Sequence, residues 1–290
     1  MHLRWQPFDH PWVIAHRGAS GLLPEHTLPG YALAIEQGAD VIEPDLVLSA
    51  DGVLHARHDL GLARSTNVAA HPQFAARRRR DGDHEDWWIA DFSADELRAL
   101  RAIQPHAKRP SERDGEFAIP SFASVLQLLE QERRRRDKPL VVYPELKHPS
   151  YFAERGLSML RALSADLARH GWTGSSAPVW IQCFELPTLL AVKRELGLRT
   201  TLLSLQLPEI CADVDGYGIS KSALMSSDGA TFIAAAHRSG QVVHAWTFRD
   251  DDVGADPYTE AMAAFAAGCD GLFGDFPATL LRARRHWSGL

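Results

Sequence analysis

Cysteine is scarce in this chain of 290 residues, which contains only Cys183, Cys211 and Cys269. Three widely spaced cysteines supply neither a disulfide framework nor a set of zinc ligands. Cys183 and Cys269 have apolar neighbours in the sequence, so we expect both to be small core residues. A fold held by disulfides and a cysteine-based metal site are therefore excluded.

The chain also lacks an apolar run long enough to cross a membrane, since a spanning helix needs about 20 such residues. Residues 1–11 contain no continuous apolar segment of the kind found in a secretory leader. As written, the sequence therefore predicts a cytoplasmic protein. Removal of a leader from a longer precursor would instead indicate a periplasmic one.

An excess of positive charge is absent as well, because the formal net charge is −6. Proteins that bind nucleic acid usually carry a basic excess on one face, so no nucleic-acid partner is expected. Two arginine runs, 77–80 and 133–136, lie beside acidic residues or at the end of a helical pattern. We interpret both as solvated faces with local ion pairs. None of these patterns specifies an oligomeric state.

What the sequence does contain is a regular alternation of apolar β-rich runs and amphipathic stretches. The runs predict eight strands: 13–16, 40–46, 140–146, 179–184, 199–204, 216–219, 242–247 and 270–273. The stretches between them predict helices at 26–36, 122–135, 152–170, 186–196, 228–239 and 258–267. This order favours a parallel (β/α)8 TIM barrel in a single 290-residue domain, with an open doubly wound sheet as the alternative.

One connection in this pattern is much longer than the others. Asp51-Gly52 is a turn signal between residues 45–48 and 53–58, so we expect a hairpin after the second strand. Residues 59–120 then differ in composition, and Ser93 and Glu96 fit the N-cap and N3 positions of a helix over 93–101. A connection of this length usually forms a lid or small subdomain. We expect an inserted subdomain over 59–120 that covers the mouth of the barrel.

Carboxylates stand at the ends of two predicted strands. Glu43 and Asp45 are two residues apart, so both point to the same face of their strand, and Glu145 ends the next barrel strand. Glu43 and Asp45 alone also fit an exposed strand face or an ion pair, but their apolar flanks argue against exposure. Buried like charges need a cation, and an all-oxygen ligand set favours Mg²⁺ or Ca²⁺. We predict one such metal ion at these three residues.

Two histidines and two cations accompany the carboxylates. His16 ends the first strand and His58 follows the hairpin. A lone histidine in an apolar strand is more often a hydrogen-bonded structural residue, but two near three carboxylates indicate an acid–base pair. Arg17 and Lys147 would bind the non-bridging oxygens of a phosphodiester.

Later strands contribute further candidates at the same end of the barrel. Gln182, Phe184 and Trp246 end strands and are candidate substrate-binding residues, although Trp246 also fits a plain core position. Asp275 precedes Pro277, so its simplest interpretation is a helix N-cap.

Together these residues resemble the glycerophosphodiester phosphodiesterase family. The matching elements span nearly the whole chain: His16-Arg17-Gly18, Pro24-Glu25-His26-Thr27, Gly38-Ala39-Asp40, Glu43-x-Asp45, Asp51-Gly52, His58-Asp59, Glu145-x-Lys147, Gln182-Cys183-Phe184, Trp246-Thr247 and Asp275-Phe276-Pro277. The insert, with Ile89-Ala90-Asp91-Phe92, looks like that of the bacterial periplasmic, calcium-using branch. The chain departs from the family pattern at His26, where many members have asparagine, and at Pro44, between two expected metal ligands.

The resemblance implies a TIM barrel with a small inserted subdomain, His16 and His58 as the acid–base pair, and Glu43, Asp45 and Glu145 as metal ligands. It implies hydrolysis of small-molecule glycerophosphodiesters, such as glycerophosphocholine, to sn-glycerol 3-phosphate and an alcohol. Two alternatives stay open. One is phospholipase D-like hydrolysis of lysophospholipids at an apolar rim, for which Trp87, Trp88 and Ile89 are a hint. The other is a catalytically silent phosphodiester-binding protein.

Overall fold

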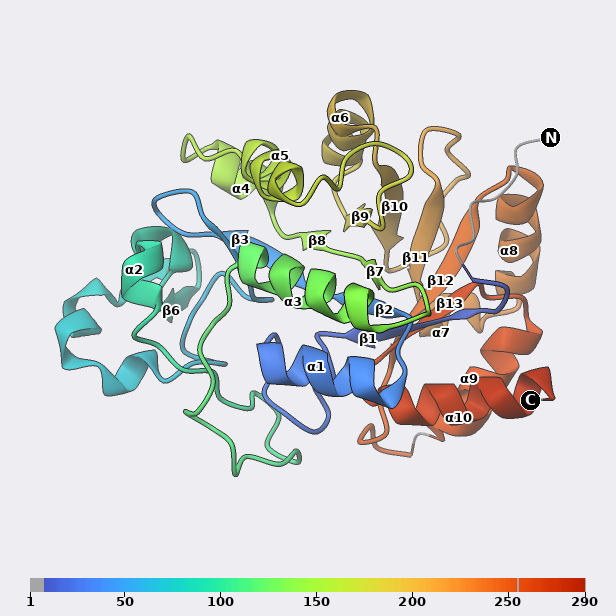
Figure 1. The fold of residues 1–290 in the computed structure, drawn as a ribbon, viewed down its shortest axis with the longest axis horizontal. Helices are drawn as coiled ribbons and strands as arrows, with labels where there is room; N and C mark the ends of the chain where they lie inside the picture. The colour runs from blue at the N-terminus through green and yellow to red at the C-terminus, as the bar shows by residue number, and fades with distance from the viewer. Residues whose placement is uncertain (1–7, 255, 290) are drawn as a thin grey trace.

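The computed structural model describes residues 8–254 and 256–289. Its centre is a ring of parallel strands in chain order, in which β13 (Gly271–Gly274) returns to pair with β1 (Trp12–His16). This pairing closes the sheet, so the fold is the predicted TIM barrel and not an open doubly wound sheet (Figure 1). Residues 1–7, on which part of the leader expectation rests, lie outside the described residues. Within the described part of the chain, no helix combines the length and apolar character needed to span a membrane.

All eight predicted strands are present, and two of them are each split in two. The second strand is interrupted at Pro44 and the third at Tyr143-Pro144. Proline has no N–H to donate to a neighbouring strand, which explains both interruptions. The remaining strands of the described sheet are β2 (Val41–Glu43), β3 (Asp45–Leu48), β4 (Leu54–Ala56), β7 (Val141–Val142), β8 (Glu145–Leu146), β9 (Trp180–Cys183), β10 (Arg199–Ser204), β11 (Gly216–Ser220) and β12 (Val242–Phe248).

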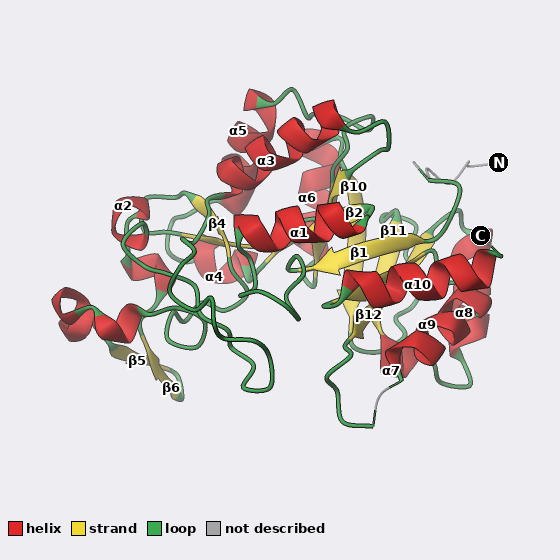
Figure 2. Cartoon of the chain, turned by 60° about the horizontal axis from the view of Figure 1, so that its bottom comes forward, coloured by secondary structure: helices red, strands yellow, loops and turns green. Residues whose placement is uncertain are grey.

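Helices cover the outside of the barrel (Figure 2). They are α1 (Leu28–Gln37), α3 (Phe122–Arg135), α4 (Pro149–Ala153), α5 (Met159–Arg169), α6 (Leu186–Leu196), α7 (Lys221–Leu224), α8 (Gly229–Arg238), α9 (Pro257–Ala266) and α10 (Pro277–Ser288). The predicted helix over 152–170 is wrong in its continuity, because Gly156 takes a positive φ of 74° and separates α4 from α5. The helix α1 begins two residues later than predicted, where the Thr27 side chain accepts a hydrogen bond from Gly30 N.

Residues 59–120 form an extended segment on one side of the barrel (Figure 1). It contains three 3₁₀ turns, a small hairpin of β5 (Arg79–Asp81) and β6 (His84–Asp86), and the helix α2 (Ala94–Leu97). The Ser93 and Glu96 side chains make the predicted capping box, although α2 is shorter than the predicted 93–101. The arginine runs form ion pairs as expected, for example between Arg77 and Glu96 at 2.5 Å.

The hint of an apolar, membrane-facing rim in this segment is wrong. Trp87, Trp88 and Ile89 are at most 9% exposed, so they pack inside the segment and do not face solvent. The indole nitrogens of Trp87 and Trp88 donate to the carbonyls of Phe74 and Arg79. A buried tryptophan needs such a partner, and an interfacial one would leave its nitrogen in water.

The inside of the barrel is filled by an aromatic cluster below the carboxyl ends of the strands. Trp12 and Trp180 come from strands that do not pair, yet their ring centroids are 5.3 Å apart across the interior. Successive side chains of a strand alternate between faces, so the inward series on β1 runs Trp12, Ile14, His16. The residues of this cluster therefore form a floor inside the barrel, one inward position below the level of His16. They are Phe8, Trp12, Ile14, Val41, Val141, Tyr143, Trp180, Val242 and Phe273.

Candidate active site

A pocket of about 370 Å³ opens at the carboxyl ends of the barrel strands. The same inward alternation that fills the floor brings His16, Glu43, Glu145 and Gln182 to this level, because each follows a residue of the floor by two positions. The lining residues are His16, Arg17, Glu43, His58, Arg64, His106, Glu145, Lys147, Gln182, Phe184, Leu203, Trp246, Thr247, Arg249 and Phe273. All predicted site residues are among them except Asp45. This residue is 1% exposed and lies beside the lining residues Glu43 and Glu145.

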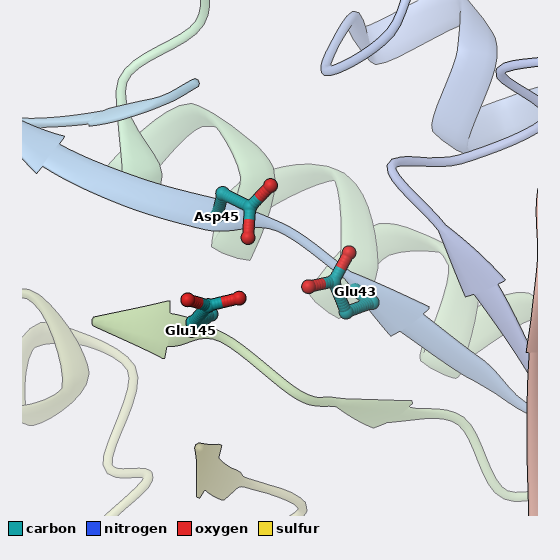
Figure 3. A group of neighbouring side chains, drawn as sticks. All are labelled: Glu43, Asp45 and Glu145. Carbon is teal, nitrogen blue, oxygen red and sulfur yellow. The ribbon is translucent and has the colours of Figure 1, made fainter. Parts of the chain in front are cut away.

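The three predicted metal ligands form one cluster. Glu43, Asp45 and Glu145 each place a carboxylate oxygen within 4.8 Å of the others, and the three carboxylates point toward one another (Figure 3). Two features of the strands produce this geometry. Asp45 stands opposite Glu145 in the β3–β8 ladder, and Glu43 lies two residues before Asp45 in the chain. All three side chains are buried, with 1%, 1% and 8% of their residue surface exposed.

The electrostatics of this cluster fit a cation. Burial and the neighbouring carboxylates raise the pKa of Glu43 and of Glu145. Burial also opposes ionisation of Asp45, but Lys147 and Arg17 outweigh it and hold the pKa of Asp45 well below its usual value. Asp45 Oδ1 is buried without a hydrogen-bond partner among the described residues. Three hard oxygen donors with one unsatisfied oxygen are suitable ligands for a divalent cation.

Neighbouring groups fix the direction of each carboxylate. Glu43 Oε1 accepts from Gln182 Nε2 at 2.9 Å, and Glu145 Oε1 lies 2.8 Å from Lys147 Nζ. Gln182 and Lys147 were both predicted to bind substrate, and the structure places each of them on the pocket wall and also against a carboxylate. Their amide and ammonium groups therefore orient the cluster.

His26, the departure from the family pattern, lies behind the cluster. It is 3% exposed, and its Nε2 lies 3.0 Å from Asp45 Oδ2 while its Nδ1 lies 2.8 Å from the Tyr31 hydroxyl. Burial lowers the pKa of His26, which keeps the ring neutral at pH 7. A neutral ring with Nε2–H donated to the carboxylate accepts the hydroxyl proton of Tyr31 at Nδ1. Histidine thus performs here the donor role that an asparagine amide can also perform.

Each of the two predicted catalytic histidines has a carboxylate on Nδ1. His16 Nδ1 lies 2.5 Å from Asp275 Oδ1, and His58 Nδ1 lies 2.5 Å from Asp59 Oδ1. A carboxylate on one ring nitrogen fixes the ring and its tautomer, so that Nε2 is the atom left for a substrate. Burial and then Arg17 lower the pKa of His16 to about 4.

The interpretation of Asp275 as a helix N-cap is wrong. The residue at the N-cap of α10 is Phe276, with no side-chain capping bond, and Asp275 is 2% exposed in the barrel. Sequence reasoning missed its partnership with His16 and also that of Asp59 with His58. The signal for the first is the closing pair of strands: Ala15 stands beside Gly274, which places His16 beside Asp275.

Arg17 has an uncommon backbone conformation, with φ of 63°. This left-handed turn directly follows β1 and brings the Arg17 amide within 3.1 Å of Glu43 Oε2. The guanidinium lies between carboxylates, with Nη1 2.7 Å from Glu25 Oε2 and Nε 3.1 Å from Asp45 Oδ2. A strained residue held by several contacts is typical of a functional position.

Residues 59–120 also reach the site. Arg109 is 6% exposed and donates to Asp275 Oδ2 at 2.6 Å and to Asp251 Oδ2 at 2.7 Å. Asp275 therefore accepts from His16 on one oxygen and from Arg109 and Arg249 on the other. These cations and His16 outweigh the effect of burial and keep the pKa of Asp275 well below its usual value.

An aromatic pair forms another part of the pocket wall. Phe184 is 46% exposed, and its ring stands edge-on to Trp246 with centroids 6.0 Å apart. Both residues lie on the pocket, as predicted, and Trp246 packs on its inner side against the aromatic floor. Trp246 therefore lines the pocket, as expected, and also packs against the core, as in the alternative interpretation.

A TIM barrel whose carboxyl-end pocket combines a carboxylate cluster, carboxylate-backed histidines and exposed cations is the architecture of an enzyme. Residues 16–279 match the glycerophosphoryl diester phosphodiesterase family, and the chain belongs to that family. It is 30% identical over 323 residues to a glycerophosphodiester phosphodiesterase of Arabidopsis thaliana, with 94% of this chain and 85% of that protein covered. A glycerophosphodiester phosphodiesterase of Haemophilus influenzae is 30% identical over 214 residues, which span 70% of this chain and 57% of that one.

The fold also has a counterpart among solved structures. An Oleispira antarctica phosphodiesterase in complex with the product sn-glycerol-3-phosphate superposes with a TM-score of 0.72 at 23% identity, covering 94% of this chain and 96% of that one. This similarity supports the fold alone.

Proposed function

We propose that this protein hydrolyses glycerophosphodiesters to sn-glycerol 3-phosphate and an alcohol, with one divalent cation, Ca²⁺ or Mg²⁺, held by Glu43, Asp45 and Glu145. The observation that carries the proposal is that His16 and His58, each with Nδ1 on a carboxylate, line the same pocket as Glu43 and Glu145. The names of the plant and bacterial relatives support the same reaction.

Binding of the phosphodiester is the task of the cations. Arg17 and Lys147 lie on the pocket wall beside the carboxylates that hold them. Arginine offers a planar fork of donors and lysine a point charge, and both suit the non-bridging phosphate oxygens. A bound divalent cation would act as a Lewis acid toward the same phosphate.

Proton transfer is the task of the histidines. Nε2 of one ring accepts the proton of the hydroxyl group that attacks phosphorus. The other ring donates a proton to the departing alkoxide. Asp275 and Asp59 stabilise whichever ring becomes positively charged during this exchange. Overall, the phosphorus–oxygen bond to the alcohol breaks, the elements of water are added, and the alcohol leaves with a proton.

The test is turnover of glycerophosphocholine by the purified protein with Ca²⁺ or Mg²⁺. A glycerol-3-phosphate dehydrogenase assay and phosphorus NMR of the products are run side by side. We expect sn-glycerol 3-phosphate and free choline, and no turnover after treatment with EDTA. Release of glycerol with phosphocholine would overturn the assignment of the cleaved bond. Full turnover by metal-free protein would overturn the role of the cation.

A further inference from the structure

Two partly exposed arginines bring positive charge to the lining of the pocket. Arg64 and Arg249 line the pocket, and their side chains are 43% and 32% exposed, in contrast to the buried carboxylate cluster. His106 also lines the pocket. Burial and then Arg109 lower the pKa of His106.

Each of these arginines is anchored at one point only. Arg64 Nη1 donates to Asp59 Oδ2 at 3.1 Å, and Arg249 Nε donates to Asp275 Oδ2 at 3.0 Å. Among residues 8–254 and 256–289, their other guanidinium nitrogens have no further hydrogen-bond partner. A guanidinium held on one edge keeps its remaining N–H groups in a fixed direction, and a planar carboxylate or a phosphate matches them.

Among the described residues, the pocket lining has no exposed carboxylate that would balance these arginines. In the described part of the chain, Glu43 and Glu145 are the carboxylates that line the pocket, and both belong to the buried cluster. Asp59 and Asp275 are not part of the described lining and are already bonded, Asp59 to His58 and Arg64, and Asp275 to His16, Arg109 and Arg249. A positively charged alcohol such as choline would therefore meet two arginines in this lining, and its favourable contacts there would be those with the rings of Phe184 and Trp246.

The variable half of the substrate needs room toward solvent, and Arg64 and Arg249 are the partly exposed cations of the lining. Glycerol is common to all glycerophosphodiesters and small enough for the floor of the pocket, whereas the alcohol varies in size and needs the open end. We propose that the pocket selects glycerophosphodiesters whose alcohol carries a second anionic group, a carboxylate or a phosphate, which Arg64 and Arg249 bind. This inference rests on the proposed hydrolysis of glycerophosphodiesters and names the substrate class within it.

Two matched substrate pairs test the proposal in the full-length protein with its cation. Glycerophosphoserine differs from glycerophosphoethanolamine by one carboxylate, and glycerophosphoinositol 4-phosphate differs from glycerophosphoinositol by one phosphate. We expect kcat/KM to be about five- to tenfold higher for at least one anionic member over its partner, because two half-exposed arginines contribute. The preference should shrink as salt is raised from about 0.05 to 0.5 M, since exposed charges are screened. The pair that responds identifies the anionic group.

Variants connect the preference to the two arginines. Arg64→Gln and Arg249→Gln should each lower the anionic-to-neutral ratio of kcat/KM, and the double variant should bring it to about one. The ratio cancels any loss of turnover common to both substrates, which matters because both arginines also touch the partners of the catalytic histidines. Arg98→Gln is the matched control, because Arg98 is 72% exposed in the same insert and pairs only locally with Asp95.

The outcomes separate this inference from the function on which it rests. Equal kcat/KM within both pairs, a preference for glycerophosphocholine, or an unchanged ratio in the double variant would overturn the inference while the hydrolase stands. Absence of turnover on all five diesters with Ca²⁺ and Mg²⁺ would overturn the proposed function itself. The wild-type comparison decides the question even where a variant fails to fold.

Discussion

Arg109 Nη2 lies 2.6 Å from Asp275 Oδ2, although the two residues are 166 positions apart in the chain. One belongs to the segment 59–120 and the other follows the last strand of the barrel. Because Asp275 also holds His16, the contact links the insert to a catalytic candidate. The insert is therefore tied to the site through a buried ion pair as well as through pocket-lining side chains.

We predict that Arg109→Gln lowers kcat about tenfold with a smaller change in KM, because Asp275 would lose a buried charge partner and hold His16 less firmly. Steady-state kinetics measure both constants. Arg109→Lys should recover part of kcat, and Arg79→Gln is the control, since Arg79 pairs with Asp91 within the insert. A kcat of Arg109→Gln equal to that of the wild type would show that this pair serves only to attach the insert.

His16→Ala and His58→Ala should each lower kcat by about 10²- to 10⁴-fold, the usual contribution of general acid–base catalysis. Substrate affinity should change much less, and the wild-type pH–rate profile should be bell-shaped. His84→Ala is the control, because His84 is an exposed residue of the insert. Either histidine variant with near-normal kcat would remove that residue from the mechanism.

Divalent cations should raise the melting temperature of the wild-type protein by several degrees at about 100 times the dissociation constant, through selective binding to the folded state. Glu43→Gln should remove most of this increase, because the cluster then offers one charged ligand fewer. Differential scanning calorimetry with Ca²⁺, Mg²⁺ or EDTA measures the effect. Glu132→Gln, which changes a carboxylate paired with Arg135 at the end of α3, should leave it intact. An increase that Glu43→Gln does not reduce would place the cation elsewhere.

Acid should destabilise the fold through His244, which is fully buried below the site. Burial lowers the pKa of His244 to about 4 from its ordinary 6.5. Because the pKa of His244 is lower in the folded state than in the unfolded state, its full contribution to the stability of the fold is present above pH 6.5. This contribution is lost as the pH falls toward 4. Between pH 7.5 and pH 5.0 the free energy of unfolding should fall by about 2 kcal/mol from this residue alone.

Urea unfolding at the two pH values gives the difference. His244→Phe should reduce the pH dependence by this amount, and His84→Phe, at an exposed position, should leave it as in the wild type. The same pH dependence in His244→Phe and in the wild type would show that other groups control the acid transition.

Local patterns in the sequence were sufficient for the strands and for the inward direction of the carboxylates, since alternation with period two is a property of each strand by itself. Glu43, Asp45 and Glu145 come from strands that are neighbours both in the chain and in space, so their convergence could be predicted. The role of Asp275 could not, because it depends on the pairing of the first and last strands, and its position before Pro277 equally suits a helix cap. The contact between Arg109 and Asp275 could not be predicted either, because no local sequence pattern indicates where a long insert folds back onto the barrel.

The partnership of His16 with Asp275 joins positions 259 residues apart, across the seam between β1 and β13. A chain without the residues that follow β12 would lack both β13 and Asp275, and His16 would then have no acceptor to set its tautomer. The final strand thus completes the hydrophobic interior and at the same time supplies the partner of His16. We therefore expect a C-terminal truncation that removes β13 and Asp275 to be inert.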